Sequence, residues 1–424
     1  MKSIVFLTVL VVLLLAAGPG AALDLDALFG DELIVLDDGS DASRDPALLQ
    51  RDPVELGGSL RMSLEYSHLT PEVPGRDSFQ ARTSGSLFAD IRFNHWLRTF
   101  AKGSWNLRLH PPRDEPLQAK LDELFVDLHW NYQVYVRAGK QNVQWGVGYF
   151  FSPADVISIG RIDPQNPSAA REGPTALRVH VPRRFSDYYV FVIADEAETW
   201  QDLALAPRVS FVAGLSEISV GGFFKLDKVP RAMATVSTSL GNTAVFAEAM
   251  ASLGSDKLFV EADPGSPLGY RVVQRTEPIF QGTIGATRQF SDDAKNFQIT
   301  AAAQYFFNGE GYRDRSFMEN PLTLGLLLAT TELSLADLNQ TGRHYAAASL
   351  NWSRMFNTAF SSNVLWLGNL SDRSGQVTLS LSYGRWDYFR PRVGYTQFYG
   401  PDFSEFGLLD RQVFVGASLI NWSF

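Results

Sequence analysis

The segment that decides the fold reads Ser59-Leu-Arg-Met-Ser-Leu-Glu-Tyr-Ser67. Its even-numbered positions are all apolar, whereas its odd-numbered positions are serine, arginine or glutamate. Successive side chains of a β-strand point to opposite faces of the sheet. This period of two therefore predicts a strand with one apolar face and one polar face.

The same alternation recurs from about Leu56 onward, in stretches of roughly ten residues. Clear examples are 87–93, 103–110 and 377–384. Strands of soluble sandwiches average about 5 to 6 residues, whereas a tilted strand that crosses a bilayer needs about 9 to 11. The length of the alternating stretches therefore favours strands that span a membrane.

The connections alternate between tight turns and long loops. We predict tight turns at 94–97, 131–133, 184–186, 241–242, 291–294, 355–356 and 387–389, and long loops at 69–79, 111–118, 147–173, 195–206, 255–278, 308–342 and 400–409. This asymmetry is typical of outer-membrane barrels. The sequence thus predicts an all-β fold, a transmembrane antiparallel up-and-down β-barrel of about 18 strands, with 16 possible. Strand starts are expected near Leu56, Ala81, Arg98, Ala119, Gln133, Pro174, Asp187, Ala206, Glu217, Arg231, Thr243, Ile279, Lys295, Arg343, Asn357, Gln376, Arg390 and Arg411.

Two of the long loops contain patterns of their own. The range 258–273 is compatible with an extra hairpin outside the membrane, and 322–338 with a short helix that carries Leu324, Leu327 and Leu328 on one side. The strand count is uncertain by two, because of this hairpin and because residues 188–194 are apolar on both faces.

The N-terminal residues 1–22 have the pattern of a cleavable signal peptide. Lys2 precedes an apolar run from Ile4 to Ala17, and small residues follow at 20–22. We expect residues 23–55, which are rich in aspartate, to form a periplasmic arm or a plug, and residues 56–424 to form the barrel.

The composition excludes several functions. The 37 Lys and Arg against 46 Asp and Glu give a net charge of −9, which disfavours nucleic acid as a partner. No cysteine is present, so a thiolate metal site, a cysteine nucleophile and a lipidated cysteine are excluded. Motifs of hydrolases and calcium loops do not occur, and we expect neither an enzyme nor a cofactor or metal site.

The end of the chain carries a more specific signal. The last predicted strand reads Arg411-Gln-Val-Phe-Val-Gly-Ala-Ser-Leu-Ile-Asn-Trp-Ser-Phe424. A period of two places Phe414, Gly416, Ile420, Trp422 and Phe424 on one face. This ending resembles that of bacterial outer-membrane β-barrel proteins, whose C-terminal aromatic strand is an assembly signal for the barrel-assembly machinery. The resemblance implies that role for Trp422 and Phe424, and an outer-membrane location in a diderm bacterium.

Within that group the chain is similar to the porins and porin-like barrels. The resemblance rests on Arg137-Ala-Gly-Lys-Gln-Asn-Val-Gln-Trp-Gly146, and on the fragments 304–312 and 342–345. It implies a channel, but it names no solute, and the oligomeric state stays open.

If the apolar faces contact lipid, the polar faces line the lumen, because a basic side chain on the lipid face costs about 2 to 4 kcal/mol at mid-membrane. The lumen candidates by strand parity are Arg61, Glu65, Asp90, Arg92, Lys102, Arg108, Glu123, Asp127, Arg137 and Arg178. Basic residues outnumber acidic ones in this set, which predicts weak anion preference.

The long connection 147–173 has two interpretations. It folds into the lumen and narrows it, as in porins, or it lies on the outer surface as an exposed loop. Its charged residues are Asp155, Arg161, Asp163, Arg171 and Glu172.

A barrel of this size encloses an aqueous channel. The sequence therefore favours a passive outer-membrane porin for small hydrophilic solutes, with outer-membrane lipid around it. Two alternatives stay open: a non-conducting barrel that acts as a binding, adhesion or assembly module through its long loops, and an exporter or hydrophobic-substrate barrel plugged by the N-terminal arm.

The C-terminal pattern generates the first testable prediction. We expect deletion of Phe424 to lower the amount of protein assembled in the outer membrane far more than it lowers secretion into the periplasm. Cell fractionation followed by a heat-modifiability gel measures both quantities. Normal assembly of the deletion variant would contradict the role of the terminal residue.

Overall fold

The computed structural model describes residues 53–70, 78–110, 116–159, 162–167, 171–195, 197–292, 297–386, 388–407 and 409–423. The predicted signal peptide and nearly all of the predicted N-terminal arm lie outside these residues. So do Arg161 and Phe424, whose predicted roles stay predictions.

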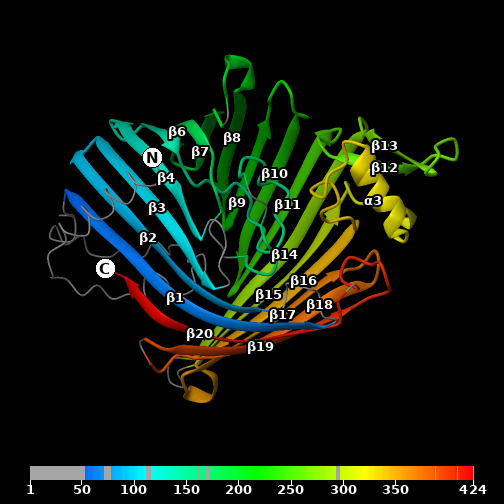
Figure 1. Ribbon diagram of the computed structural model, residues 1–424. Coiled ribbons are helices and arrows are strands. Elements are labelled where there is room, and N and C mark those ends of the chain that lie inside the picture. The colour runs from blue at the N-terminus through cyan, green and yellow to red at the C-terminus, as the bar shows by residue number, and fades with distance from the viewer. Residues whose placement is uncertain are drawn as a thin grey trace.

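The described residues form an 18-stranded sheet in which strands that are neighbours in sequence are neighbours in the sheet. The strands are β1 (Val54–Thr70), β2 (Ser78–Asn94), β3 (Leu97–His110), β4 (Leu117–Trp130), β5 (Val134–Lys140), β6 (Thr175–Arg183), β7 (Ser186–Ile193), β8 (Ala204–Ala213), β9 (Ser216–Phe223), β10 (Arg231–Leu240), β11 (Thr243–Leu253), β14 (Pro278–Asp292), β15 (Phe297–Asn308), β16 (His344–Ser353), β17 (Phe360–Asn369), β18 (Ser374–Tyr383), β19 (Arg390–Tyr399) and β20 (Arg411–Ser423). All pairs are antiparallel, and β20 pairs with β1 to close the barrel (Figure 1). The predicted fold class is confirmed, and the predicted starts at Arg231, Thr243, Arg390 and Arg411 coincide with the observed ones.

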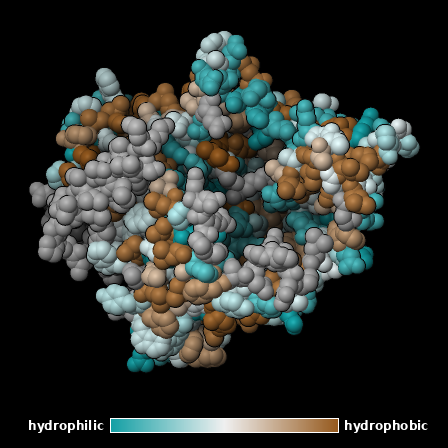
Figure 2. Space-filling model, in the orientation of Figure 1, coloured by the Kyte–Doolittle hydropathy of each residue, from teal (hydrophilic) through white to brown (hydrophobic). Residues whose placement is uncertain are grey.

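The outer face of the barrel is apolar. Leu379 of β18 is paired with Val364 of β17 and Tyr395 of β19, and cross-strand partners point to the same side of a sheet. Leu379 is nevertheless 49% exposed, although it lies in the middle of its strand. Figure 2 shows such hydrophobic residues over the wall formed by β1 and β20, and hydrophilic residues around the hollow at the centre. An exposed apolar band of this kind requires a lipid environment.

The last strand departs from the predicted parity. The register of β20 against β1 shifts by one residue, since Ile420 pairs with Met62 but Ser418 pairs with Ser63. Beyond this β-bulge the two faces of a strand exchange. The prediction that Phe414 and Gly416 share a face with Trp422 was therefore wrong.

Phe414 pairs with Ser67 and lies on the inner face. The guanidinium carbon of Arg392 lies 5.7 Å from the centre of the Phe414 ring. Trp422 pairs with Leu60 and is 51% exposed on the outer face.

Two long loops, between β11 and β14 and between β15 and β16, fold against each other outside the barrel sheet. They contain β12 (Leu258–Ala262), β13 (Tyr270–Gln274) and the helix α3 (Pro321–Thr330), together at one end of the barrel, on the right in Figure 1. Phe259, Phe317 and Leu327 form their core, against which Leu324 and Leu328 pack. The predicted extra hairpin is confirmed, and the predicted helix is present but ends earlier, at Thr330.

Short 3-10 turns at Trp200–Asp202, Ser316–Met318 and Met355–Asn357 complete the secondary structure of the described residues. Within those residues, none of the helices has both the length and the apolar character that a membrane-spanning helix needs.

The face assignment generates a second prediction. We expect Leu379→Arg to destabilise the folded barrel by about 2 to 4 kcal/mol, because it places a charge against lipid, whereas Ser380→Arg is tolerated on the inner face. Folding into lipid vesicles followed by denaturant titration measures both variants. Equal effects, or a larger effect for Ser380→Arg, would contradict the register of β18.

Candidate functional site in the barrel lumen

The described residues of the connection between β5 and β6, which are 141–159, 162–167 and 171–174, lie inside the barrel. They are called the inner segment below. Near its start, the Trp145 ring contacts Phe191 of β7 edge-on, at 5.5 Å between ring centroids. Further along, Phe151 stacks on Phe306 of β15 at 5.1 Å. One segment can reach strands this far apart in the sheet only through the lumen. Of the two interpretations of 147–173, the structure shows the inward one, and Figure 1 shows the segment in teal in front of β10 and β11.

Glu248 of β11 holds the centre of this inner segment. Its carboxylate accepts hydrogen bonds from the backbone N–H groups of Val147 and Gly148, at 2.5 Å each, and of Ala154 at 2.9 Å. The hydroxyl of Ser152 donates to it as well, at 3.0 Å. Glu248 is only 4% exposed, and these donors compensate for the burial of its charge.

Gln304 of β15 provides the second attachment. Its side-chain carbonyl oxygen accepts from the N–H groups of Tyr149 and Phe150, at 3.1 and 2.6 Å, while its amide donates to the Phe151 carbonyl at 2.6 Å. A glutamine can satisfy both the N–H and the C=O groups of one tight turn, because it has a donor and an acceptor.

Glycine is required where the segment meets these anchors. A Cβ at Gly146 would lie 1.6 Å from the Ser152 hydroxyl and 2.6 Å from the Glu248 carboxylate. A Cβ at Gly148 would lie 1.9 Å from the Phe151 carbonyl oxygen. The inner segment can therefore fold this tightly only because these positions lack a side chain.

Four charged residues of the inner segment have protein partners. Asp155 is buried and pairs with Arg171, and Glu172 pairs with Lys140 at the end of β5. Asp163 accepts from the N–H of Gln165 within a turn, at 2.9 Å.

The lumen candidates of the strands share the face that carries Glu248 and Gln304. Arg137 pairs with Arg178, and Arg178 pairs with Phe191, whose ring contacts the inner segment. The registers of β1 to β5 extend the same face to Arg61, Glu65, Asp90, Arg92, Lys102, Arg108, Glu123 and Asp127.

Carboxylates on this inner face bridge the arginines of neighbouring strands. Asp90 binds Arg92 at 2.5 Å and Arg98 at 2.7 Å. Asp127 binds Arg98 at 3.4 Å and Arg137 at 2.6 Å. These four strands, β2 to β5, are thus tied by a continuous network of charges.

Other inner-face charges have different partners. Glu65 pairs with Arg392 of β19, and Glu123 accepts from the N–H of Asn142 at 3.4 Å. Among the described residues, by contrast, Arg61, Lys102 and Arg178 make no side-chain hydrogen bond or ion pair. The Nε of Arg178 is buried without a hydrogen-bond partner.

Aromatic rings hold the arginines of this network in place. Phe88, Phe100 and Phe125 form a row across β2, β3 and β4, with centroids 6.1 and 5.2 Å apart. The guanidinium of Arg137 lies 3.7 Å from the centre of the Phe125 ring, a cation–π contact. The guanidinium heads are therefore fixed in position.

Sequence reasoning missed several residues of this site. Arg98 has the same parity as Lys102 in β3, so the rule already in use could have found it. Glu248 is the only acidic residue in the apolar strand Thr243–Leu253, and this isolation was its only signal. Arg208 donates to the Trp145 carbonyl at 3.1 Å, and no local pattern marks that contact.

No protein-family model matches the chain, and no curated protein matches it in sequence. Solved structures match it in fold. Acinetobacter baumannii OccAB1 aligns with a TM-score of 0.51 at 10% identity, over 88% of this chain and 97% of OccAB1. The outer membrane protein OpdK of Pseudomonas aeruginosa aligns with a TM-score of 0.50 at 8% identity, over 87% and 99%.

The chain has the fold of the outer-membrane porins. Pseudomonas aeruginosa OccK9 also matches, with a TM-score of 0.51 at 8% identity, over 88% of this chain and 98% of OccK9. At these identities the likeness concerns the path of the backbone. The charges and the anchors of the inner segment therefore have to be interpreted from this chain's own residues.

The anchoring of the inner segment generates a third prediction. We expect Glu248→Ala to release it, so that the amide protons of Val147, Gly148 and Ala154 exchange with solvent at least tenfold faster, because their shared acceptor is lost. Hydrogen exchange with mass spectrometry, on peptides covering 145–156, measures this.

Glu261→Ala on β12 is the matched control, since Glu261 pairs with Arg271 and Arg275 outside the barrel sheet. Equal exchange in Glu248→Ala and wild type would contradict the anchoring role.

Proposed function

We propose that this protein is an outer-membrane porin, a passive diffusion channel for small hydrophilic solutes with weak anion preference. The observation that carries the proposal is a closed 18-stranded barrel that is apolar outside and charged inside. Barrels of 16 to 18 strands enclose more space than their own side chains fill. The porin fold of the solved structures described above supports the same function.

The inner segment is proposed as the constriction. It contacts the wall of the lumen from β7 to β18, through Trp145, Phe151 and Gln165. On the face of β1 to β5, which carries Arg61 and Lys102, it meets Glu123 through Asn142 and Lys140 through Glu172. Because Asp155, Arg171 and Glu172 are already paired, the segment contributes mainly bulk. Selection by size is then a property of the segment, and selection by charge a property of the strands.

The proposed anion preference rests on the charges that stay unpaired. The acids Asp90 and Asp127 are shared between arginines, while Arg61, Lys102 and Arg178 keep their charge uncompensated by contact partners. Fixed positive charge in a confined aqueous space concentrates anions. The preference is weak because the lumen also carries carboxylates.

A binding or adhesion module is the second candidate, and one observation favours it. The loops that contain β12, β13 and α3 have a hydrophobic core of their own, and compact loops packed by their own side chains are frequently functional. Steady open steps of the purified protein in a planar bilayer support the porin, whereas silence supports this candidate or a barrel plugged by residues 23–55.

The proposed partners follow from the outer face. Its apolar residues contact outer-membrane lipid, and Trp422 on this face, with Phe424, is proposed as the signal for the barrel-assembly machinery.

The charge argument generates a fourth prediction. In a planar bilayer with a KCl gradient around 0.1 M, we expect a reversal potential of the sign for chloride preference. We expect Lys102→Gln with Arg178→Gln to reduce it by at least half. The preference should nearly vanish near 1 M salt, where the Debye length falls from about 10 Å to about 3 Å.

Arg288→Gln with Arg411→Gln is the matched control, because both arginines lie on the outer face by register. A cation preference in the unmodified channel, or equal effects of the two double variants, would contradict this account of the lumen.

A further inference from the structure

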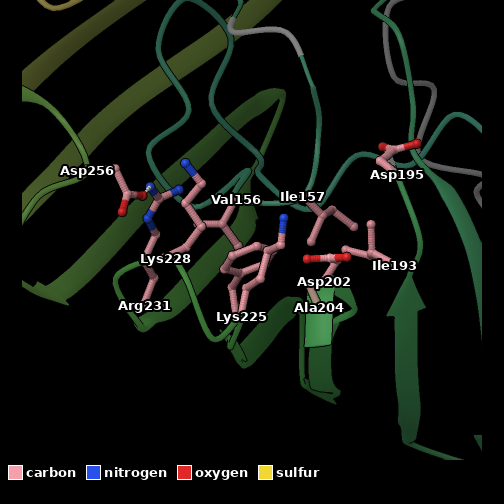
Figure 3. A pocket seen from close by; sticks show the side chains of 11 residues that line it. Val156, Ile157, Ile193, Asp195, Asp202, Ala204, Lys225, Lys228, Arg231 and Asp256 are labelled. Carbon is pink, nitrogen blue, oxygen red and sulfur yellow. Dashed lines mark hydrogen bonds and ion pairs between the residues drawn. The ribbon is translucent and has the colours of Figure 1, made fainter. Parts of the chain in front are cut away.

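A pocket of about 310 Å³ opens at the end of the barrel where β7 and β9 end and β8 and β10 begin. It lies where β7, β9 and β10 meet the inner segment, and Figure 3 shows its side chains. By volume it holds about ten water molecules, at roughly 30 Å³ each. The pocket therefore fits a small solute of about ten non-hydrogen atoms.

The floor of the pocket is apolar. Ile157 of the inner segment and Ile193 at the end of β7 are buried in the core beneath it, and Val156 and Phe223 cover that core in part. A solute that displaces water from this floor gains hydrophobic contact.

One wall of the pocket carries basic groups from the connection between β9 and β10. Arg231 is neutralised by Asp256, at 2.5 Å. The ammonium of Lys225 lies 3.6 Å from Asp227, which is 62% exposed, so that this ion pair is weak. The Lys228 side chain makes no hydrogen bond or ion pair within the described residues. The lysines thus supply the available positive charge.

The opposite wall carries Asp195 and Asp202, from the connection between β7 and β8 (Figure 3). Oδ2 of Asp202 accepts from the N–H and the hydroxyl of Thr199, at 2.8 and 2.9 Å, whereas Oδ1 accepts no hydrogen bond from the described residues. These hydrogen bonds lower the pKa of the Asp202 carboxyl, so it is ionised at neutral pH. Oδ1 of Asp195 accepts a hydrogen bond from the N–H of Thr175 at 2.9 Å, which leaves Oδ2 as an acceptor for a solute.

We propose that this pocket binds a small zwitterion of the amino-acid type with an apolar side chain. The solute's carboxylate faces Lys225 and Lys228, its ammonium faces Asp195 and Asp202, and its side chain contacts Val156 and Phe223. A simple anion or a simple cation meets attraction on one wall and repulsion on the other, whereas a zwitterion oriented across the pocket is attracted by both. This binding site goes beyond the proposed function, since binding does not depend on conduction.

Three matched probes test the proposal: L-leucine, 4-methylpentanoate, which lacks the ammonium, and 3-methylbutylamine, which lacks the carboxylate. Isothermal titration of the full-length protein in detergent gives their affinities. We expect L-leucine to bind at least tenfold more tightly than either of the others. Equal affinity of L-leucine and 4-methylpentanoate would contradict a zwitterion site and indicate an anion site. The absence of saturable binding of L-leucine would contradict any amino-acid site in this pocket.

Two variants test the orientation. Lys228→Gln should weaken L-leucine about tenfold and tighten 3-methylbutylamine, because a charge that repels the amine is removed. Asp195→Asn, which retains an acceptor for the Thr175 N–H, should weaken L-leucine similarly and tighten 4-methylpentanoate for the corresponding reason. Lys120→Gln, on the exposed part of β4, is the control, and a heat-modifiability gel checks that each variant folds. Wild-type affinity for L-leucine in both pocket variants would overturn the proposal.

Discussion

The pairing of the first strand with the last is the constraint on which the rest of the structure depends. Within hydrocarbon no water is present to satisfy a free N–H or C=O group, so a sheet that crosses a bilayer cannot have an edge. The ladder from Ser59 with Ser423 to Thr70 with Arg411 removes that edge. It does so even at the cost of a β-bulge, which reverses the faces of β20 between Phe414 and Trp422. The barrel is thus closed, although the alternation of inner and outer side chains along β20 is interrupted.

Closure also creates the environment in which the charged residues act. Once the sheet is closed, one face of every strand is withdrawn from lipid. On that face the backbone register holds Arg137 of β5 beside Arg178 of β6, although their charges repel each other. Asp127 reduces that repulsion by binding Arg137 and Arg98 together. Arg178 makes no such ion pair with the described residues. The free energy of folding of the rest of the barrel must therefore offset the cost of holding its charge beside Arg137.

Much of the fold could be predicted from the sequence because a period of two is a local property. About ten residues are enough to recognise each strand by its alternation, and polar residues indicate the turns. The face assignment holds wherever the strand is regular, as in Leu379 and Ser380. It fails at bulges, since one unpaired residue, as between Leu121 and Glu123, changes the parity of all that follow.

The site was less predictable, because its contacts are not local. Glu248 lies about a hundred positions from the amides that it binds, and Gln304 lies farther still. Only the three-dimensional structure brings them to the turn at Gly148. The composition of 147–173 therefore allowed both an exposed loop and an inward one, and the ion pairs of Asp155 and Glu172 could not be foreseen.

The attachment of the inner segment has a consequence for the order of biogenesis. The segment follows β5, but its acceptors lie on β11 and β15, which are synthesised and inserted later if strands are added in sequence. The tight turn of the segment cannot form before its acceptor strands are in place, because contacts between residues this far apart in sequence form slowly. The contacts of Glu248 and Gln304 with the inner segment thus belong to a late step of folding, after β11 and β15 are in place.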